Sequence, residues 1–531
     1  MTSQNIPPTR FQWKNSKLGT WEREIDECET FYIHMKRNGS ACYPIIGCAS
    51  FTIKSPNTGT TDDVENRERY MVQDTLLKAW ETLCYEHPTL CSRIELDESG
   101  TRKRFYSTFQ DLDERKNWLS STFKVVHTNG DPHQWFNDQE RSFENSVLVV
   151  SMSRDKDTYD PTIFLQCPHD VTDGVGILQL VDQLFQYAAL AYEQGDQYIL
   201  PVWGGEHVRL PPCLRVAAMI PESPSEIQVK RFNEIQTQNW SIYKHPNLLS
   251  LPPSSHDTAS NGKRHRVSII IPQSTTKQII LKCKQIAPGV SVTHIFMSAL
   301  AMALSELQPR RGESYAVRYV NHSMINLRPY CRAPFNTPEH AAAPYHTVSA
   351  QALGIDLIVP ESSIETERGE GVSELPRIAT QVRDFYKTIR PASPQDEQVV
   401  LSSLMFKSLT TPPGSDPHAV SDPPFCPAVI SSLGNINSIM RAIHGAFELT
   451  NVWAASEPIG AGVAIFLGTW NGRIELSGVF DTRYHDSGYM KNFLERLINC
   501  VSRGLGVDGH ASPILVTSAE ETQRYKHKRG T

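Results

Sequence analysis

A short apolar run passes through a polar turn directly into a long amphipathic segment at residues 162–191, and this order constrains the fold more than any other feature. The run at 162–167 has the length and the flanking prolines of a buried strand. After the turn, apolar residues recur at the spacing of one helix face: Ile177, Leu180, Val181, Leu184, Tyr187, Ala188 and Ala191. A similar run at 146–152 predicts a hairpin with the first. Strands followed by helices in this way predict an α/β fold.

A comparable series of elements begins again in the second half of the chain. The segment 246–264 is polar and rich in serine and proline, which is typical of an interdomain linker. It separates an N-terminal lobe, residues 1–245, from a C-terminal lobe, residues 265–531. In the second lobe we expect strands at 265–271, 315–325, 429–433, 463–467 and 472–481, helices at 291–307 and 486–502, and a proline-rich loop at 410–427. The expected architecture is α/β, with each lobe an α+β two-layer sandwich.

Charge and cysteine usage argue against several classes of protein. The 52 basic and 58 acidic residues give a net charge of -6, which favours neither nucleic acid nor an anionic membrane surface. The 11 cysteines are odd in number and include no C-x-x-C pair, so we expect reduced thiols. The most apolar run, 295–304, is too short to cross a bilayer. These features predict a cytoplasmic protein without membrane or nucleic-acid partners, and monomer is the default.

The turn after the first predicted strand contains the pattern H-x-x-x-D-G at His169, Asp173 and Gly174. A neutral imidazole can take the proton from a hydroxyl or amine that attacks a thioester, so His169 is the candidate general base. Asp173, turned inward and paired with an arginine, would hold the loop in place. Gly174 would remove a Cβ where the chain turns tightly into the helix. The alternative is a core histidine in an ordinary strand-to-helix turn.

The same region contains two further carboxylates and no pattern of metal ligands. Asp170 and Asp182 are expected to be surface or capping carboxylates rather than catalytic groups. His169 has no second His or Cys nearby at ligand spacing, so we expect no metal.

Four stretches of the chain, in order, resemble one superfamily of acyltransferases. They are residues 86–94, 168–176, 320–329, and 431–435 with 472–481. Together they resemble the superfamily that contains chloramphenicol acetyltransferase, peptide-synthetase condensation domains and the BAHD acyltransferases. The single motif His, the W-E-R opening at 21–23, the E-T-F-Y segment at 29–32 and the chain length are most similar to the fungal trichothecene 15-O-acetyltransferase group.

The resemblance implies a fold and a set of site residues. It implies two chloramphenicol-acetyltransferase-like lobes with an active-site tunnel between them, in which the acyl donor and the acceptor meet at His169. It implies that Asp173 forms a structural ion pair with Arg328 across the lobes. It also suggests that Ser431 or Ser432 lines the tunnel and stabilises the oxyanion, the alternative being ordinary strand packing.

Departures from the family pattern narrow the expected chemistry. The D-F-G-W-G segment of plant BAHD enzymes is absent, Pro168 stands where condensation domains have a first His, and we expect no attached carrier domain. We therefore expect an acyl-CoA-dependent O-acyltransferase, with acetyl-CoA the favoured donor. Its acceptor would be a hydroxyl of a small secondary metabolite such as a terpenoid, for example in mycotoxin biosynthesis. Both substrates would bind together, without an acyl-enzyme.

Two alternatives stay open at this point. One is a condensation-like enzyme that takes a carrier-bound acyl group or forms an amide. The other is a non-catalytic protein that binds small molecules on a transferase scaffold.

Overall fold

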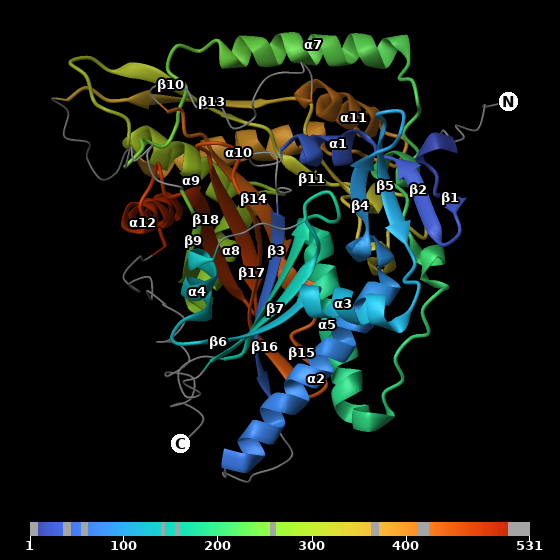
Figure 1. Cartoon of the computed structure of the whole chain (residues 1–531). Helices are drawn as coiled ribbons and strands as arrows, with labels where there is room; N and C mark the ends of the chain where they lie inside the picture. Colours follow the sequence, from blue (N-terminus) through green and yellow to red (C-terminus); the bar gives the residue numbers. More distant parts are fainter. Residues whose placement is uncertain are drawn as a thin grey trace.

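The computed structural model describes residues 9–35, 44–54, 62–139, 144–153, 160–254, 262–362, 371–410 and 424–507. Two large sheets, with helices packed against them, form the centre of the described chain (Figure 1). Among the described residues, no helix combines the length and the apolar character that a membrane span needs.

The larger sheet has six strands in the order β15-β16-β3-β8-β7-β6. Their bounds are β3 (Pro44–Ile53), β6 (Phe123–Thr128), β7 (Val147–Ser153), β8 (Thr162–Pro168), β15 (Ile443–His444) and β16 (Phe447–Ser456). Every residue of β7 and β8 is buried, as expected for strands that are covered on both faces. These two strands pair antiparallel, which confirms the predicted hairpin; its connection, 154–159, lies outside the described residues.

Two long helices, α2 (Asp62–Glu86) and α5 (Gly174–Gln194), cover one face of this sheet. The predicted apolar stripe of α5 is buried except for Tyr187, which is partly exposed, so the helix is confirmed. Gly47 of β3 allows α5 to approach closely, because a Cβ at this position would lie 2.9 Å from Ile177 Cγ1. Since β8 ends at Pro168 and α5 begins at Gly174, the H-x-x-x-D-G turn lies at the carboxyl end of β8, a central strand of the sheet.

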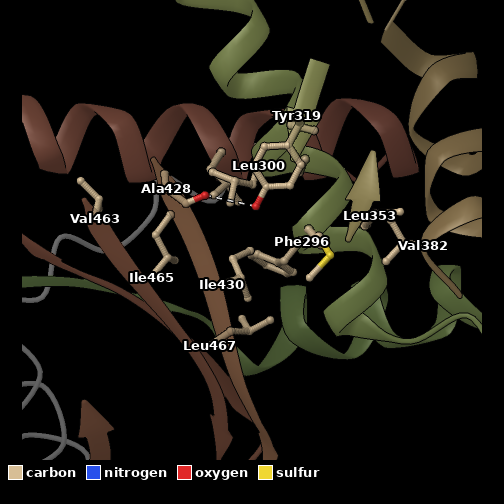
Figure 2. Packing of buried hydrophobic residues seen from close by; sticks show 14 of the residues in the cluster. Phe296, Leu300, Tyr319, Leu353, Val382, Ala428, Ile430, Val463, Ile465 and Leu467 are labelled. Atoms are coloured by element: carbon tan, nitrogen blue, oxygen red, sulfur yellow. Dashed lines mark hydrogen bonds between the residues drawn. The ribbon is translucent and has the colours of Figure 1, made fainter. Parts of the chain in front are cut away.

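The second sheet has four strands in the order β14-β17-β18-β9. The strands are β9 (Arg264–Ile271), β14 (Ala428–Asn435), β17 (Val463–Trp470) and β18 (Arg473–Asp481), and the helices packed beside them are α8 (Gln273–Ile286), α9 (Val292–Glu306), α10 (Gly371–Ile389) and α12 (Ser487–Leu505). Figure 2 shows the shared core, where Phe296 and Leu300 of α9 face Ile430 and its strand neighbours. In the same core, the Tyr319 hydroxyl donates to the Ala428 carbonyl at 3.1 Å. The predicted strands of this sheet and the helices at 291–307 and 486–502 are confirmed.

The inner faces of the two sheets meet in a third apolar cluster. Ile46, Phe164 and Trp453 of the larger sheet contact Phe466 and Val479 of the second. The second half of the chain also contributes two strands, β15 and β16, to the larger sheet. β15 and β16 follow β14 in the sequence, yet β16 pairs with β3 along its whole length. The lobe boundary at 246–264 therefore stays a prediction.

Smaller elements surround the two sheets. They are β1 (Lys14–Lys17), β2 (Thr20–Glu24), β5 (Arg102–Ser107) and β4 (Arg93–Leu96) in one sheet, the pairs β10 (Tyr315–Asn321) with β13 (Leu353–Val359) and β11 (Met324–Asn326) with β12 (His346–Val348), and helices α1 (Glu27–His34), α3 (Leu112–Thr122), α4 (Pro132–Asp138), α6 (Leu214–Ala217), α7 (Glu226–Tyr243) and α11 (Glu397–Leu409).

The single strand predicted at 315–325 is wrong. The structure has two strands there, β10 and β11, which pair with different partners. The chain is redirected at Ser323, whose N–H donates to Ser349 Oγ at 3.0 Å instead of continuing the ladder. The predicted loop at 410–427 falls largely on residues 411–423, which lie outside the described residues.

Candidate active site

His169 is the first residue after β8, and its ring is almost completely buried. Its Nδ1 lies 3.0 Å from the carbonyl oxygen of Thr172, three residues along the same turn. A carbonyl can only accept a hydrogen bond, so Nδ1 carries the ring proton. In the neutral imidazole the basic lone pair is then on Nε2. The turn therefore fixes the tautomer of the ring as well as its orientation.

The surroundings of His169 keep the ring neutral. Burial lowers its pKa to about 3, and His346 nearby acts in the same direction. At pH 7 the imidazole is unprotonated, which is the form that can accept a proton from an attacking hydroxyl.

This neutral state makes the stability of the fold depend on pH. The pKa of His169 is lower in the folded state than its ordinary value of 6.5, so below pH 6.5 the unfolded chain binds a proton that the folded chain does not. Stability is then lost as the pH falls, by up to about tenfold in the folding equilibrium per pH unit for this one group. We expect the urea midpoint of the wild type to fall more steeply between pH 7 and pH 5 than that of His169→Ala. Parallel slopes for the two proteins would contradict this.

Asp173 joins the motif turn to α5 in two ways. As the N-cap of α5, its side chain accepts hydrogen bonds from the N–H groups of Val175 and Gly176, each at 3.0 Å. It also pairs with Arg328, whose Nη1 lies 2.5 Å from the carboxylate. Both side chains are at most 4% exposed. Burial alone would raise the pKa of Asp173, but Arg328 and the cap N–H groups hold it below its ordinary value.

Arg328 comes from a short 3-10 helix, Arg328–Tyr330, that follows β11. Besides Asp173, its guanidinium donates to the carbonyl of Ala343 at 2.7 Å. The structure thus brings Asp173 and Arg328 together, 155 residues apart in the sequence. The contact ties the turn after β8 to the second half of the chain.

The glycines of the motif region provide space. The φ of Gly174 lies outside the left-handed region, so the backbone does not require glycine there. A Cβ at Gly174 would instead lie 3.0 Å from Leu433 Cδ2 of β14. Gly176 is tighter still, because a Cβ there would overlap Thr172 Oγ1, the carbonyl of Ala341 and the Arg328 guanidinium.

The two candidate serines are half-buried on β14 and project to opposite sides of the strand. Ser432 Oγ lies 2.8 Å from Thr293 Oγ1, on the side of α9. Ser431 is in register with Phe466, which belongs to the cluster between the two sheets. Of the two, Ser431 therefore faces the space between the sheets, and its role there stays a prediction.

A second buried network, which the sequence did not indicate, holds the other side of the turn. Arg104 is fully buried and donates to both the side chain and the carbonyl of Asp170, at 2.6 and 2.8 Å. Its Nε also donates to Glu29 at 2.9 Å, and Glu29 accepts a bidentate pair of bonds from Arg23. The expectation that Asp170 is a surface or capping carboxylate is wrong, because this carboxylate pairs with an arginine beside His169. Asp182 is partly exposed and accepts from the backbone N–H of Arg441.

We expect Arg104→Met to lower the free energy of unfolding by about 3 kcal/mol, because Asp170 would remain buried without a countercharge. Glu29 would still be paired with Arg23, so the expected loss of stability is at the lower end of the range for a broken buried ion pair. Arg93→Ala on neighbouring β4 is the control, since its partner Glu95 is exposed and such pairs contribute at most about 1 kcal/mol. Equal urea midpoints for the two variants would show that the network contributes little.

Two aromatic residues next to His169 complete the site. Tyr32 of α1 stacks on the imidazole, with ring centroids 4.0 Å apart and planes at 11°. Its hydroxyl lies 2.6 Å from Nε2 of His346 on β12. Tyr32 falls in the E-T-F-Y segment that the resemblance singled out, whereas nothing in the sequence pointed to His346. Among the described residues, no group of three His, Cys, Asp or Glu is arranged to hold a metal ion.

Comparison with solved structures identifies the fold. No family model matches the chain. The structure is similar to the TRI3 trichothecene 15-O-acetyltransferase from Fusarium sporotrichioides, with a TM-score of 0.76 and 14% identity over 94% of this chain and 99% of that one. It is also similar to the first condensation domain of the calcium-dependent antibiotic synthetase, with a TM-score of 0.56 and 12% identity over 92% of this chain and 96% of that one. The chain has the fold shared by chloramphenicol acetyltransferase-like enzymes and condensation domains.

Sequence comparison gives the activity class. The acetyltransferase pigO of Monascus ruber is 22% identical over 506 residues, which cover 93% of this chain and 98% of pigO. The O-acetyltransferase pigM of the same organism is 22% identical over 513 residues, 93% of this chain and 88% of pigM. Because both relatives are acetyltransferases and align over almost the whole chain, the chain is an acyltransferase.

Proposed function

We propose that this acyltransferase transfers an acyl group, with acetyl favoured, from acyl-CoA to a hydroxyl of a small secondary metabolite such as a terpenoid. The observation that carries the proposal is the state of His169: a neutral imidazole with Nδ1 bonded to the Thr172 carbonyl and its turn held on both sides by buried arginines. A neutral imidazole can take the proton of the attacking hydroxyl as the new bond forms, and burial makes this one a weaker base than a free histidine. The acetyltransferase relatives support the acyl group and the donor.

In the proposed reaction His169 first accepts a proton from the acceptor and then donates it to the leaving thiolate. The acceptor oxygen attacks the thioester carbon while its proton passes to Nε2 of His169, which gives an imidazolium and a tetrahedral oxyanion. The carbon–sulfur bond then breaks, the thiolate of CoA leaves with the proton from Nε2, and the ester is released. The imidazole returns to its neutral form, so both substrates react in one ternary complex without an acyl-enzyme. Ser431, on the face between the sheets, is the candidate donor to the oxyanion.

The test is a screen of the purified protein against hydroxylated secondary metabolites, with acetyl-CoA and longer acyl-CoAs as donors. We expect thiol release that depends on the acceptor, together with an acylated product by mass spectrometry. The matched control is the same acceptor with its hydroxyl converted to a methyl ether. Thiol release that does not depend on the hydroxyl would contradict acyl transfer to an alcohol.

A condensation-like reaction is the second candidate, because condensation domains share the fold. It predicts transfer from an acyl group on the phosphopantetheine of a separate carrier protein. The same screen, with an acylated carrier protein in place of acyl-CoA, separates the two. Product from the carrier alone would favour this second candidate.

A further inference from the structure

Helix α1 presents two residues to the candidate active site from one of its faces. Glu29 and Tyr32 are three positions apart, a spacing that places both side chains on one side of a helix. Glu29 accepts from Arg104, which in turn holds Asp170 beside His169. Tyr32 contacts the imidazole itself. The helix is fixed at its start by a capping box between Asp26 and Glu29, so this face has a defined position.

The ring of Tyr32 is itself held in place. Its hydroxyl is 2.6 Å from Nε2 of His346, and both side chains are buried. Burial lowers the pKa of His346, so this imidazole is neutral and its Nε2 can accept from the tyrosine O–H. His346 lies on β12, which pairs with β11 just ahead of Arg328. The stack on His169 is therefore built from two distant parts of the chain.

We infer that Tyr32 and His346 are positioning residues for His169. The Tyr32 ring fixes the plane of the imidazole, and His346 fixes the Tyr32 ring. The inference rests on the proposed function for its catalytic meaning. One edge of the imidazole is held by the Thr172 carbonyl and one face by Tyr32. With an edge and a face both restrained, the ring cannot turn about its side-chain bonds, so Nε2 keeps one direction.

The groups that face His169 explain why the stack also affects its protonation. They are Tyr32 from α1, His346 from β12, and Asp173 of its own turn, whose charge is balanced by Arg328. Asp173 favours the protonated ring, whereas His346 and burial oppose it. Removal of the Tyr32 ring would admit water to one face of His169 and move its pKa upward, toward 6.5.

The experiment compares Tyr32→Leu, Tyr32→Phe and His346→Leu by two readouts. The first is thiol release from acetyl-CoA with an acceptor found in the screen, analysed as separate kcat and KM. The second is an NMR titration of the protein labelled with ¹³C at histidine Cε1, in which the signal that disappears in His169→Ala identifies His169. Tyr319→Phe is the matched control, because it removes a buried, hydrogen-bonded hydroxyl in the core of the second sheet.

The expected results separate loss of the stack from loss of the hydrogen bond. Tyr32→Leu removes the stack and should lower kcat about a hundredfold at nearly constant KM, with the His169 titration moved upward. Tyr32→Phe keeps the stack, so kcat should fall only about fivefold, the effect of one lost hydrogen bond, and the titration should stay in place. His346→Leu should match Tyr32→Phe. The double variant, Tyr32→Phe with His346→Leu, should be no worse than the more severe single change, since both remove the same bond.

The inference is overturned if Tyr32→Leu titrates at His169 like the wild type, or if its kcat equals that of Tyr319→Phe. If the proposed function itself were wrong, the results would differ from those of a failed inference. In that case wild type releases no thiol with any donor and acceptor, while the NMR titration still decides whether Tyr32 controls the environment of His169.

Discussion

His169→Ala is expected to lower the rate of acceptor-dependent thiol release from acetyl-CoA by about 10²- to 10⁴-fold, the usual contribution of a positioned general base. The Thr172 carbonyl fixes the tautomer of the ring and burial keeps it neutral, whereas the carboxylates of the same turn are paired with Arg104 and Arg328. The loss should appear in kcat, because the imidazole acts on the proton that moves during bond formation. Affinity for acyl-CoA should change little.

The control for this variant is His485→Phe. His485 is fully buried and stacks on Tyr489 near the start of α12, so the change alters a buried histidine outside the site while it keeps an aromatic ring in the stack. Rates near wild type are expected for it. If His169→Ala matched wild type in turnover, His169 would not be the base. If wild type and His169→Ala bound acyl-CoA equally and neither turned it over, the non-catalytic alternative would be favoured.

The second large effect is expected for Arg328→Ala, which should lower the free energy of unfolding by about 4–5 kcal/mol. The change leaves the Asp173 carboxylate buried without its countercharge and removes the donor to the Ala343 carbonyl. Asp173 also caps α5, so the penalty acts on the helix that begins at the motif. Thiol release should fall as well, because the turn that carries His169 loses its tie to the second half of the chain.

Urea unfolding, followed by circular dichroism, measures this effect. Arg496→Ala is the control, because Arg496 pairs with Glu306 at the surface and should contribute at most about 1 kcal/mol. The double variant Arg328→Ala with Asp173→Asn should be more stable than Arg328→Ala alone, since the amide oxygen can still cap α5 and no buried charge remains. A midpoint for Arg328→Ala equal to that of Arg496→Ala would show that the buried pair does not stabilise the fold.

Local patterns predicted much of the fold. The strands β7 and β8 and the helices α5, α9 and α12 follow from apolar runs and periodicities within a short window. The break between β10 and β11 did not follow, because the same apolar stretch pairs with β13 on one side of Ser323 and with β12 on the other. The addition of β16 to the larger sheet was equally hidden, since its partner β3 lies about 400 residues earlier in the chain.

The residues of the candidate site also divide into those that the sequence predicts and those that it does not. His169, Asp173 and Gly174 form a contiguous motif, and Arg328 entered through the resemblance to a family. Arg104 and His346 had no such signal. Their contacts with Asp170 and Tyr32 span 66 and 314 residues, and a single arginine or histidine in a strand carries no pattern that predicts a buried partner. The space that Gly176 provides was also missed, because the atoms that it accommodates include a carbonyl of Ala341.

The pairing of β16 with β3 has a consequence for how the protein is made. During synthesis on the ribosome, β3 emerges about 400 residues before β16, the strand that pairs with its free side. Until then β3 has an open edge, which other nascent chains could join and which a chaperone would have to shield. A fragment cut in the 246–264 segment would keep that open edge permanently. The turn that bears His169 also waits for later parts of the chain, because Arg328 and His346 belong to the second half.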